Sequence, residues 1–474
     1  MRLDRAALDR PFLEHAGHAP SSVWAVFDRT GVLHSGSTGA LDDGSAPTTA
    51  TAYRIASCTK SFTAAAVLSL RDDGLLRLAD PITRFVPEFA DVALPTVDSP
   101  IPTIAMLLTM SAGFPTDDPW ADRQEAMTDD QFTALLRQGV SFESIPGTGF
   151  AYSNLSFALL GRVIERASGS PYRRLITTRF LEPLGLTSSA FDTSVRTADG
   201  VASGYRAKNS GWERLPFSTP GAFSPIGGLF TTANDLASWA RWLCAAFDGE
   251  AADATGPGLA RASRREMQQL HRYAPGRGEH PCGYGFGLFV EQYPREGPVV
   301  SHSGGYPGFS AHMRWSVASG LGIVAFANAT GARVSVPTTA AFNALLKHHA
   351  GSPSRLSWSQ TAPARAAVTS LIVHWSDELA ASLFSENVAL DDSFEHRRAE
   401  ITAAVSAIGG LTGGVEPPDD EAATSTASHQ IWQLSGRTGN VRVEILLTPE
   451  NPPRVQTLKV APAALGAEQS VMRA

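Results

Sequence analysis

Residues 53–60, with the sequence YRIASCTK, are the stretch that decides the fold of this chain. Ser57 and Lys60 are three positions apart, and residues 61–70 are mostly small or apolar, which predicts a helix over 57–70. Side chains at positions i and i+3 lie on the same face of a helix, so the Lys60 amine can reach the Ser57 hydroxyl. A serine hydroxyl becomes an effective nucleophile only when a nearby base takes its proton. The stretch therefore predicts a serine–lysine pair at the start of a helix.

The Ser-x-x-Lys spacing is weak evidence by itself, because chance readily produces it in a chain of 474 residues. Lysine is scarce here, however, and Lys60 is the only lysine with a serine three positions before it. A lysine acts as a base near neutral pH only if burial or a neighbouring cation lowers its pKa. The alternative interpretation is a solvated lysine on an amphipathic helix.

A second segment, residues 146–154 with the sequence PGTGFAYSN, supplies two further candidates. Its glycines and proline predict a tight loop that leads into a helix. Tyr152 on such a loop can carry a proton when positive charge lies beside it, and Asn154 can donate to a substrate carbonyl. Taken alone, Tyr152 is better explained as a packed aromatic residue and Asn154 as a helix cap.

A third segment, residues 302–309 with the sequence HSGGYPGF, follows a predicted strand. Its glycines allow a ligand to come close to the backbone. The backbone N–H of Gly305 would then be a second oxyanion donor beside the N–H of Ser57. The alternative is a glycine-rich hairpin turn in which His302 has no chemical role.

Composition excludes several classes of protein. The net charge of −7 and the lack of a basic run with interleaved aromatics argue against a nucleic-acid partner or an anionic membrane surface. No stretch approaches the roughly 18 apolar residues of a membrane span, and the first twenty residues lack the apolar core of a signal peptide, so we expect a cytoplasmic location. Three cysteines without metal-ligand spacing predict neither a disulfide framework nor a metal site, and we expect no cofactor.

The order of strands and helices predicts an α+β fold. Strand patterns occur near both ends of the first 350 residues, as a hairpin over 22–37 and as strands between 283 and 329, of which the first covers 285–290. We expect these to pair in one antiparallel sheet flanked by helices, with the intervening helices forming an all-helical lobe. The predicted helices lie at 57–70, 103–110, 129–137, 155–167 and 234–247.

The end of the chain predicts a separate small domain. We assign residues 1–350 to a first domain, 351–360 to a linker rich in Pro, Ser and Ala, and 361–474 to a small α+β domain. This last part weakly resembles a cystatin-like (NTF2-like) module. It has predicted helices at 366–384 and 393–408, a polar loop at 413–428, and strands at 430–434, 441–447 and 454–460.

Together the motifs resemble one family, the serine β-lactamase and penicillin-binding-protein-like superfamily. The resemblance is to its branch of class C β-lactamases, D,D-peptidases and family VIII carboxylesterases, and it covers about residues 20–350. Besides the three motifs, it rests on YRIAS at 53–57, DGLLRLADP at 73–81, FLEPLGL at 180–186 and GGLFTT at 227–232.

The resemblance implies a β-lactamase/transpeptidase-like two-lobed fold and an acyl-enzyme mechanism. It implies Ser57 as nucleophile with Lys60 and Tyr152 as the acid/base pair. It places Asn154 at the acyl side of the substrate, and His302, Ser303 and Gly304 where the family has Lys-Thr-Gly. The N–H groups of Ser57 and Gly305 would form the oxyanion hole.

His302 departs from the lysine that β-lactamases carry. A lysine is a fixed positive charge for a substrate carboxylate, whereas a histidine of ordinary pKa is largely neutral at pH 7. We therefore expect a serine hydrolase of small esters or amides, with a D-amino-acid-specific peptidase or a β-lactamase as alternatives. A catalytically silent binding protein of the same fold is the alternative from another class, and a homo-oligomer is compatible with the sequence.

Overall fold

The computed structural model of the chain describes residues 3–249, 258–276, 279–294, 296–348, 358–412 and 426–463. The chain divides into two compact units, Met1–Ala350 and Gly351–Ala474. Each unit has its own cluster of buried apolar side chains. The Ser57 motif lies in the first unit.

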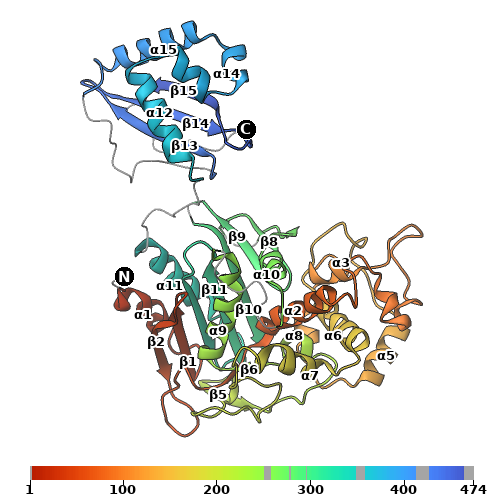
Figure 1. Ribbon diagram of the computed structural model, residues 1–474. Helices are drawn as coiled ribbons and strands as arrows, with labels where there is room; N and C mark the ends of the chain where they lie inside the picture. Colours follow the sequence, from red (N-terminus) through yellow and green to blue (C-terminus); the bar gives the residue numbers. More distant parts are fainter. Residues whose placement is uncertain are drawn as a thin grey trace. The chain divides into compact units, whose positions relative to one another are not determined.

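An eight-stranded antiparallel sheet forms the centre of the first unit (Figure 1). Its strands follow the order β2-β1-β12-β11-β10-β9-β8-β7, so the N-terminal hairpin pairs with strands from beyond residue 280, as predicted. The strands are β1 (Ser21–Phe27), β2 (Val32–Gly39), β7 (Arg272–Tyr273), β8 (Cys282–Tyr284), β9 (Phe289–Tyr293), β10 (Gly297–Tyr306), β11 (Phe309–Ser316) and β12 (Gly322–Ala327). Two small pairs accompany them, β3 (Tyr53–Arg54) with β6 (Phe230–Thr231) and β4 (Gly204–Lys208) with β5 (Gly211–Leu215).

The helices lie on the sheet and in a separate lobe. They are α1 (Arg5–Glu14), α2 (Lys60–Asp72), α3 (Ile104–Leu108), α4 (Asp118–Ala121), α5 (Asp129–Gln138), α6 (Asn154–Ser168), α7 (Tyr172–Ile176), α8 (Ser224–Gly227), α9 (Ala233–Cys244), α10 (Arg261–Met267) and α11 (Ser335–His348). Short helical turns are η1 (Ala56–Thr59), η2 (Ile82–Arg84), η3 (Pro87–Phe89), η4 (Thr177–Leu181) and η5 (Ala245–Phe247). The predicted two-lobed α+β architecture is confirmed. In the described part of the chain, no helix is both long and apolar enough to cross a membrane.

The sheet is covered on both faces, and strand β1 shows why. Trp24 and Val26 pack in a cluster with residues of α1 and α11, whereas Val23 and Phe27 belong to the large cluster that includes α2 and α9. Successive side chains of a strand point to opposite faces, so a strand that is apolar at every position is buried on both.

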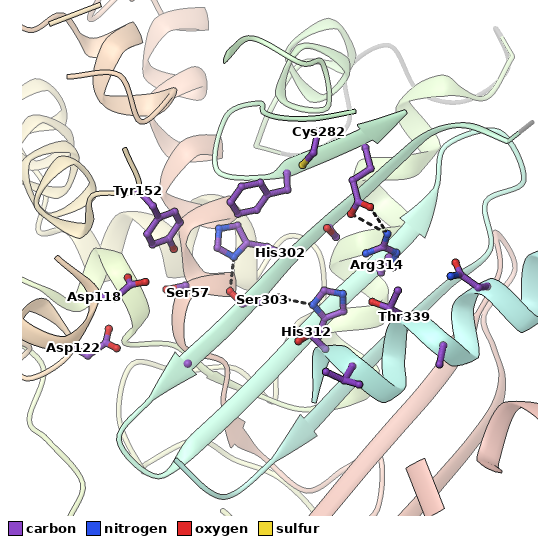
Figure 2. A pocket seen from close by; sticks show the side chains of 18 residues that line it. Ser57, Asp118, Asp122, Tyr152, Cys282, His302, Ser303, His312, Arg314 and Thr339 are labelled. Carbon is purple, nitrogen blue, oxygen red and sulfur yellow. Dashed lines mark hydrogen bonds and ion pairs between the residues drawn. The ribbon is translucent and has the colours of Figure 1, made fainter. Parts of the chain in front are cut away.

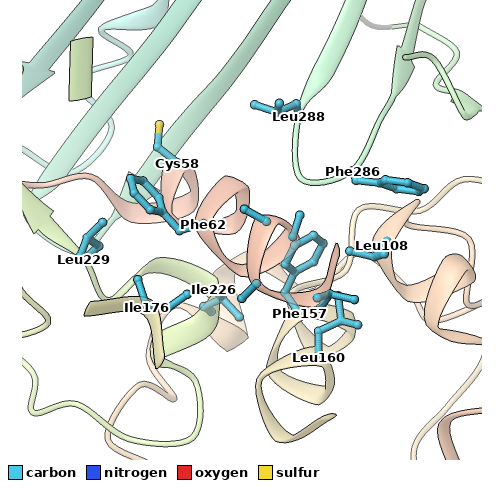
Figure 3. Packing of buried hydrophobic residues seen from close by; sticks show 14 of the residues in the cluster. Cys58, Phe62, Leu108, Phe157, Leu160, Ile176, Ile226, Leu229, Phe286 and Leu288 are labelled. Atoms are coloured by element: carbon cyan, nitrogen blue, oxygen red, sulfur yellow. The ribbon is translucent and has the colours of Figure 1, made fainter. Parts of the chain in front are cut away.

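Helix α2 is enclosed on all sides, and every residue from Lys60 to Leu70 is buried. Figure 3 shows Phe62 and Cys58 on one side of this helix and Phe157 and Ile226 on another. The Phe62 ring stacks on Trp239 with 3.8 Å between ring centroids. A helix that is apolar all round belongs in a core, and this enclosure fixes the position of Lys60 at its first turn.

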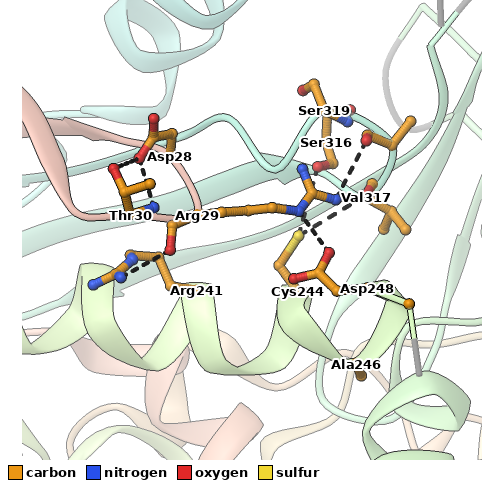
Figure 4. A network of polar contacts seen from close by, with 12 residues as sticks. Asp28, Arg29, Thr30, Arg241, Cys244, Ala246, Asp248, Ser316, Val317 and Ser319 are labelled. Carbon is orange, nitrogen blue, oxygen red and sulfur yellow. Dashed lines mark hydrogen bonds and ion pairs between the residues drawn. The ribbon is translucent and has the colours of Figure 1, made fainter. Parts of the chain in front are cut away.

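Arg29, in the turn between β1 and β2, bonds this end of the hairpin to Val317 and Asp248 (Figure 4). Its Nη2 donates to the carbonyl of Val317 at 3.2 Å, and its Nε pairs with Asp248 at 2.5 Å. Asp28 closes the turn by accepting from the backbone N–H groups of Thr30 and Gly31. The predicted hairpin over 22–37 is confirmed.

One predicted strand of the first unit is wrong. The stretch 285–290 is not a strand but the turn that joins β8 to β9, and only its last two residues are in β9. Gly287 at this turn has φ +71, and a Cβ there would lie 2.5 Å from the carbonyl oxygen of Lys60. A glycine with positive φ marks a turn, and the alternating pattern around it conceals that signal.

The second unit contains four helices and a three-stranded antiparallel sheet among its described residues. They are α12 (Thr361–Val373), α13 (Asp377–Leu383), α14 (Glu386–Asp391), α15 (Phe394–Ala407), β13 (His429–Ser435), β14 (Asn440–Leu447) and β15 (Val455–Pro462). The single helix predicted over 366–384 is wrong, because Ser376 caps a new helix by accepting from the N–H of Leu379 at 3.2 Å. Residues 351–357 of the predicted linker and 413–425 of the predicted loop lie outside the described residues. The cystatin-like resemblance stays a prediction.

Candidate active site

Ser57 lies in the short turn η1, directly before α2. Ala56 immediately precedes it with φ 48, a left-handed conformation that costs a non-glycine residue about 1–3 kcal/mol. Strained backbone of this kind persists only where the surroundings hold it, and here β10 and α8 pack against the turn. The turn leaves Ser57 only 7% exposed, at the wall of a cavity.

Lys60 reaches Ser57 as the sequence predicts. Its Nζ lies 2.9 Å from Ser57 Oγ and 2.9 Å from the carbonyl oxygen of Ile226, and its side chain is fully buried. Burial lowers the pKa of Lys60 to about 8, although Asp118 and Asp122 oppose this shift. A lysine with such a pKa is partly neutral near physiological pH and can accept a proton. The alternative of a solvated Lys60 is wrong.

Tyr152 completes the group around Ser57. Its hydroxyl is hydrogen-bonded to Ser57, and Lys60 Nζ lies 5.2 Å from the centre of its ring. Burial raises the pKa of Tyr152 well above 10, so its phenol is protonated at neutral pH. The loop is anchored by the N–H of Ala151, which donates to the carbonyl of Met110 at 3.0 Å.

Strand β10 brings the third motif against the nucleophile turn. A Cβ at position 304 would lie 2.3 Å from the carbonyl oxygen of Ile55 and 3.1 Å from the backbone nitrogen of Ser57, so only glycine fits there. Gly305 follows at the cavity wall, with open space where its Cβ would be. The close approach brings this part of β10 against the turn that contains Ser57, and the role of the Ser57 and Gly305 N–H groups as an oxyanion hole stays a prediction.

His302 and Ser303 are held by hydrogen bonds of their own. The Nε2 of His302 lies 3.1 Å from the Tyr284 hydroxyl, and its Nδ1 lies 2.6 Å from the Ser303 carbonyl oxygen. Ser303 Oγ lies 2.9 Å from Nδ1 of His312 on the neighbouring strand β11. Burial and the nearby Arg314 and His302 keep the pKa of His312 well below 6.5, so this imidazole is neutral.

The helical lobe contributes carboxylates. Asp117 accepts from the N–H groups of Asn154 and Leu155 at 2.6 and 2.9 Å and so caps α6. Asn154 is fully buried, and its Nδ2 donates to Asp118 at 2.6 Å. The structure does not place Asn154 among the cavity-lining residues, so its predicted contact with the acyl group stays a prediction. Burial and the neighbouring carboxylates raise the pKa of Asp122 to about 7.

The cavity beside Ser57 has a volume of about 830 Å³ (Figure 2). In Figure 2, Asp118 and Asp122 lie on the lobe side of Ser57, and His302, Ser303 and His312 lie on the sheet side. At the far end, Arg314 is paired with both carboxylate oxygens of Glu291 at 2.9 Å. The other lining residues are Tyr152, Cys282, Phe289, Ser301, Gly305, Ser335, Val336, Thr339, Ala340 and Asn343.

A second network of buried charges lies beside the turn that contains Ser57. Arg54, three positions before Ser57, forms an ion pair with Glu125, and both side chains are almost completely buried. Glu125 also accepts from Tyr306 Oη at 2.8 Å and Ser218 Oγ at 3.1 Å. It therefore connects β3, the lobe and the turn after β10.

The matched family identifies the chain. A sequence model of the Beta-lactamase family matches residues 6–347. The chain belongs to the beta-lactamase family. Proteins of this family are generally serine hydrolases, and the Ser57, Lys60 and Tyr152 group lies inside the matched region.

Individual beta-lactamase relatives are distant. The chain is 28% identical over 290 residues to "Protein flp" of Staphylococcus aureus (strain N315), an alignment that covers 59% of this chain and 53% of that protein. It is 27% identical over 286 residues to "Penicillin-binding protein 4*" of Bacillus subtilis (strain 168), covering 55% and 57%. The chain therefore spans about half the length of the curated relatives it matches.

Solved structures confirm the beta-lactamase/transpeptidase-like fold. An octameric penicillin-binding protein homologue from Pyrococcus abyssi superimposes with a TM-score of 0.63 at 20% identity, covering 96% of this chain and 100% of that one. A D-stereospecific amidohydrolase from Streptomyces sp. gives 0.57 at 23% identity, covering 71% and 98%. EstCE1, a hydrolase with promiscuous acyltransferase activity, gives 0.57 at 20% identity with the same coverages.

Sequence reasoning missed several residues of this beta-lactamase-family cavity. His312 had a usable signal: the hairpin turn at Pro307 and Gly308 pairs position 303 with position 312. Asp118 and Asp122 had none, because they belong to a loop and the short helix α4 whose position depends on the tertiary fold. Outside the cavity, three possible metal ligands, Asp392, His396 and Glu400, lie within 4.8 Å of one another in the second unit. The expected absence of a metal stays a prediction.

Proposed function

We propose that the protein is a serine hydrolase that cleaves small carboxylic esters or amides through an acyl-enzyme on Ser57. The observation that carries this proposal is the buried Lys60 amine, 2.9 Å from Ser57 Oγ, with a pKa lowered to about 8. A neutral amine beside Ser57 supplies the base that a serine hydroxyl needs to become an effective nucleophile.

Acylation begins when Ser57 Oγ attacks the substrate carbonyl carbon and its proton passes to the neutral Lys60 amine. The negative charge on the former carbonyl oxygen is stabilised by the backbone N–H groups of Ser57 and Gly305. When the tetrahedral intermediate collapses, the bond to the leaving group breaks and the leaving group takes a proton. The Tyr152 phenol, bonded to Ser57, passes this proton on from Lys60.

Deacylation follows the same route in reverse. Water takes the place of the leaving group, gives a proton to the Lys60 and Tyr152 pair, and attacks the acyl carbon. The acid product leaves, and Ser57 recovers its hydroxyl proton. No step requires a metal or a cofactor.

An esterase or amidase is favoured over a dedicated β-lactamase by the residue at 302. His302 is bonded to Tyr284 and to a backbone carbonyl, so it does not present a lysine-like cation to a substrate carboxylate. Two related folds carry hydrolase names of this kind, the D-stereospecific amidohydrolase and EstCE1. A D-amino-acid-specific peptidase is the second candidate, and the carboxylates of Asp118 and Asp122 in the cavity favour it.

Assembly and location are separate proposals. A related fold is described as octameric, which supports a homo-oligomer for this chain, and gel filtration with light scattering would test it. The cytoplasmic location stays a prediction.

The test is covalent labelling of Ser57 with a fluorophosphonate, combined with hydrolysis of p-nitrophenyl acetate and butyrate. We expect one adduct per chain and ester turnover in the wild type. Ser57→Ala should abolish both, and the exposed Ser359→Ala should change neither. A wild type that hydrolyses neither ester and gains no adduct would leave the silent binding protein as the better explanation. Faster turnover of a D-alanyl p-nitroanilide than of the esters would favour the peptidase.

A further inference from the structure

Two buried nitrogen atoms on the sheet side of the cavity lack hydrogen-bond partners among the described residues. They are Nε2 of His312 and Nε of Arg314, and both residues line the cavity beside Ser57 (Figure 2). Each of the two residues is only 3% exposed, so bulk solvent does not surround either side chain. A buried polar atom without a partner is costly, and two such atoms in one cavity wall indicate a place for a ligand group.

Strand β11 presents both side chains on the same face of the sheet. Positions 312 and 314 are two residues apart, and alternate residues of a strand point the same way with about 6.6 Å between them. One small group can therefore contact both side chains. In the register with β10, Ser303 lies opposite His312, and the adjacent Gly304 touches the turn that contains Ser57. The two nitrogen atoms thus lie one strand, about 4.8 Å, further across the sheet, within reach of an elongated substrate.

Other atoms of both side chains are already engaged within the protein. Nδ1 of His312 lies 2.9 Å from Ser303 Oγ. Arg314 Nη2 donates to both carboxylate oxygens of Glu291 and to Tyr293 Oη, each at 2.9 Å. These contacts fix the orientation of the imidazole and of the guanidinium. The unpartnered nitrogen atoms therefore have fixed positions, and a ligand group need not order them when it binds.

The charges of the cavity wall favour an uncharged ligand group. Glu291 offsets the charge of Arg314, and burial keeps the pKa of His312 well below 6.5, so this imidazole is neutral. The lining residues on the lobe side include two further carboxylates, those of Asp118 and Asp122. An anion at this place would lose its hydration without meeting a surplus of positive charge.

The two nitrogen atoms also define the hydrogen bonds that the group must make. Arg314 Nε carries a hydrogen and can only donate, whereas His312 Nε2 donates or accepts according to which ring nitrogen carries the hydrogen. A hydroxyl or a primary amide both donates and accepts, so it can pair with both nitrogen atoms in either case. A carboxylate only accepts, and an alkyl group does neither.

We infer that His312 and Arg314 bind an uncharged hydroxyl or amide group of the substrate, remote from the carbonyl that Ser57 attacks. The inference rests on the proposed function, because it describes a second part of the substrate that the acyl-enzyme mechanism would process. The preferred substrates are therefore elongated esters or amides with a neutral polar end, and not those that end in a carboxylate or in plain hydrocarbon.

Two series of esters test this site, each with three members that differ only in a terminal amide, carboxylate or isopropyl group. Phenyl suberamate, phenyl hydrogen suberate and phenyl 8-methylnonanoate carry this group on the acyl side. The esters 6-acetoxyhexanamide, 6-acetoxyhexanoate and 6-methylheptyl acetate carry it on the alcohol side. We expect kcat/KM for the amide to exceed that for both other members by at least about fivefold in one series. The series that shows this preference identifies the part of the substrate that reaches the site.

Variants of His312 separate ligand binding from the support of Ser303. His312→Asn keeps a polar atom near the position of Nδ1 and removes Nε2, so the amide preference should fall several-fold. His312→Gln keeps a polar atom near the position of Nε2 and should retain more of the preference. Arg314→Lys keeps the charge of this side chain and removes Nε, and it should also reduce the preference. The exposed His374→Asn and Arg398→Lys should leave it unchanged.

The two proposals fail in different ways. If the fluorophosphonate does not label Ser57 and no ester is cleaved, the hydrolase proposal fails. If Ser57 is labelled and neither series shows an amide preference, the hydrolase stands and the site at His312 and Arg314 is wrong. A preference for the carboxylate member, or an amide preference that survives both His312→Asn and Arg314→Lys, also overturns the site.

Discussion

Two buried cations flank the nucleophile at equal distances along the chain, Arg54 three positions before Ser57 and Lys60 three positions after it. Arg54 is paired with Glu125, whereas Lys60 faces a hydroxyl and a carbonyl. Burial lowers both pKa values, that of Arg54 to about 10 and that of Lys60 to about 8. Arg54 thus stays charged at every physiological pH, and Lys60 does not. A paired buried charge holds the structure together, and an unpaired one is free to exchange protons.

The largest effect should come from removing the unpaired cation. Lys60→Met keeps the length of the side chain and removes the base, so kcat/KM for ester hydrolysis should fall by about 10²–10⁴. The melting temperature should change little, because the variant removes a buried amine but also leaves the buried Ile226 carbonyl without its donor. The exposed Lys208→Met is the control and should keep wild-type activity. Near wild-type turnover by Lys60→Met would remove Lys60 from the mechanism.

Removing the partner of Arg54 should mainly affect stability, whereas removing Lys60 mainly affects activity. Glu125→Gln leaves Arg54 buried and uncompensated, and should cost about 3–5 kcal/mol of unfolding free energy measured by calorimetry. The exposed Glu143→Gln should change stability by less than about 0.5 kcal/mol. If Glu125→Gln unfolds like the wild type, the ion pair does not hold the nucleophile turn.

Arg54 is paired with Glu125 and Lys60 serves as the base. We therefore expect backbone N–H groups, and not a side-chain cation, to stabilise the negative charge that develops on the substrate oxygen. Gly305→Pro removes one N–H and should cost about 2.7–4 kcal/mol of transition-state stabilisation, measured as kcat/KM. Gly305→Ala keeps the N–H and fits the open space at this position, so it should remain active. Equal activity of the two variants would exclude Gly305 from the oxyanion hole.

The smallest effect is the pH dependence. Because the lowered pKa of Lys60 leaves it neutral only above about 8, kcat/KM should rise by about tenfold per pH unit below that value and level off above it. Because the pKa of Lys60 in the folded protein is about 8 and its ordinary value is 10.5, this group lowers stability as the pH falls from about 10.5 to about 8 and changes it no further below 8. A flat rate profile from pH 6 to 9 would contradict the assignment.

Much of the site could be predicted from sequence because its key pair is local. Ser57 and Lys60 share a helical face, which spacing alone reveals; Tyr152 and the glycines of β10 were candidates from their own segments, and the resemblance to a known family assigned their roles. Glu125, Asp118 and Asp122 could not be found in this way. They lie in a loop and a single short helix, where Asp118 bonds to Asn154, 36 positions away, and Glu125 bonds to residues 71 to 181 positions away along the chain.

In the fold, too, some elements could be predicted from local sequence and others could not. The apolar residues of β1 and α2 indicated a strand and a helix at the right places, because burial on more than one face leaves a nearly continuous apolar pattern. The break between α12 and α13 was missed, since it depends on Ser376 capping a helix within a stretch that reads as continuous. The turn at Gly287 was missed because glycine there serves a close contact with α2 and not a visible turn motif.

Gly304 and Gly305 are adjacent, yet they differ in what they permit for protein engineering. Position 304 has no room for a single extra carbon, whereas position 305 faces open space. A library that seeks new substrates should therefore keep Gly304 constant and vary position 305 among small residues other than proline. Position 303 can be varied as well, provided that His312 is varied with it.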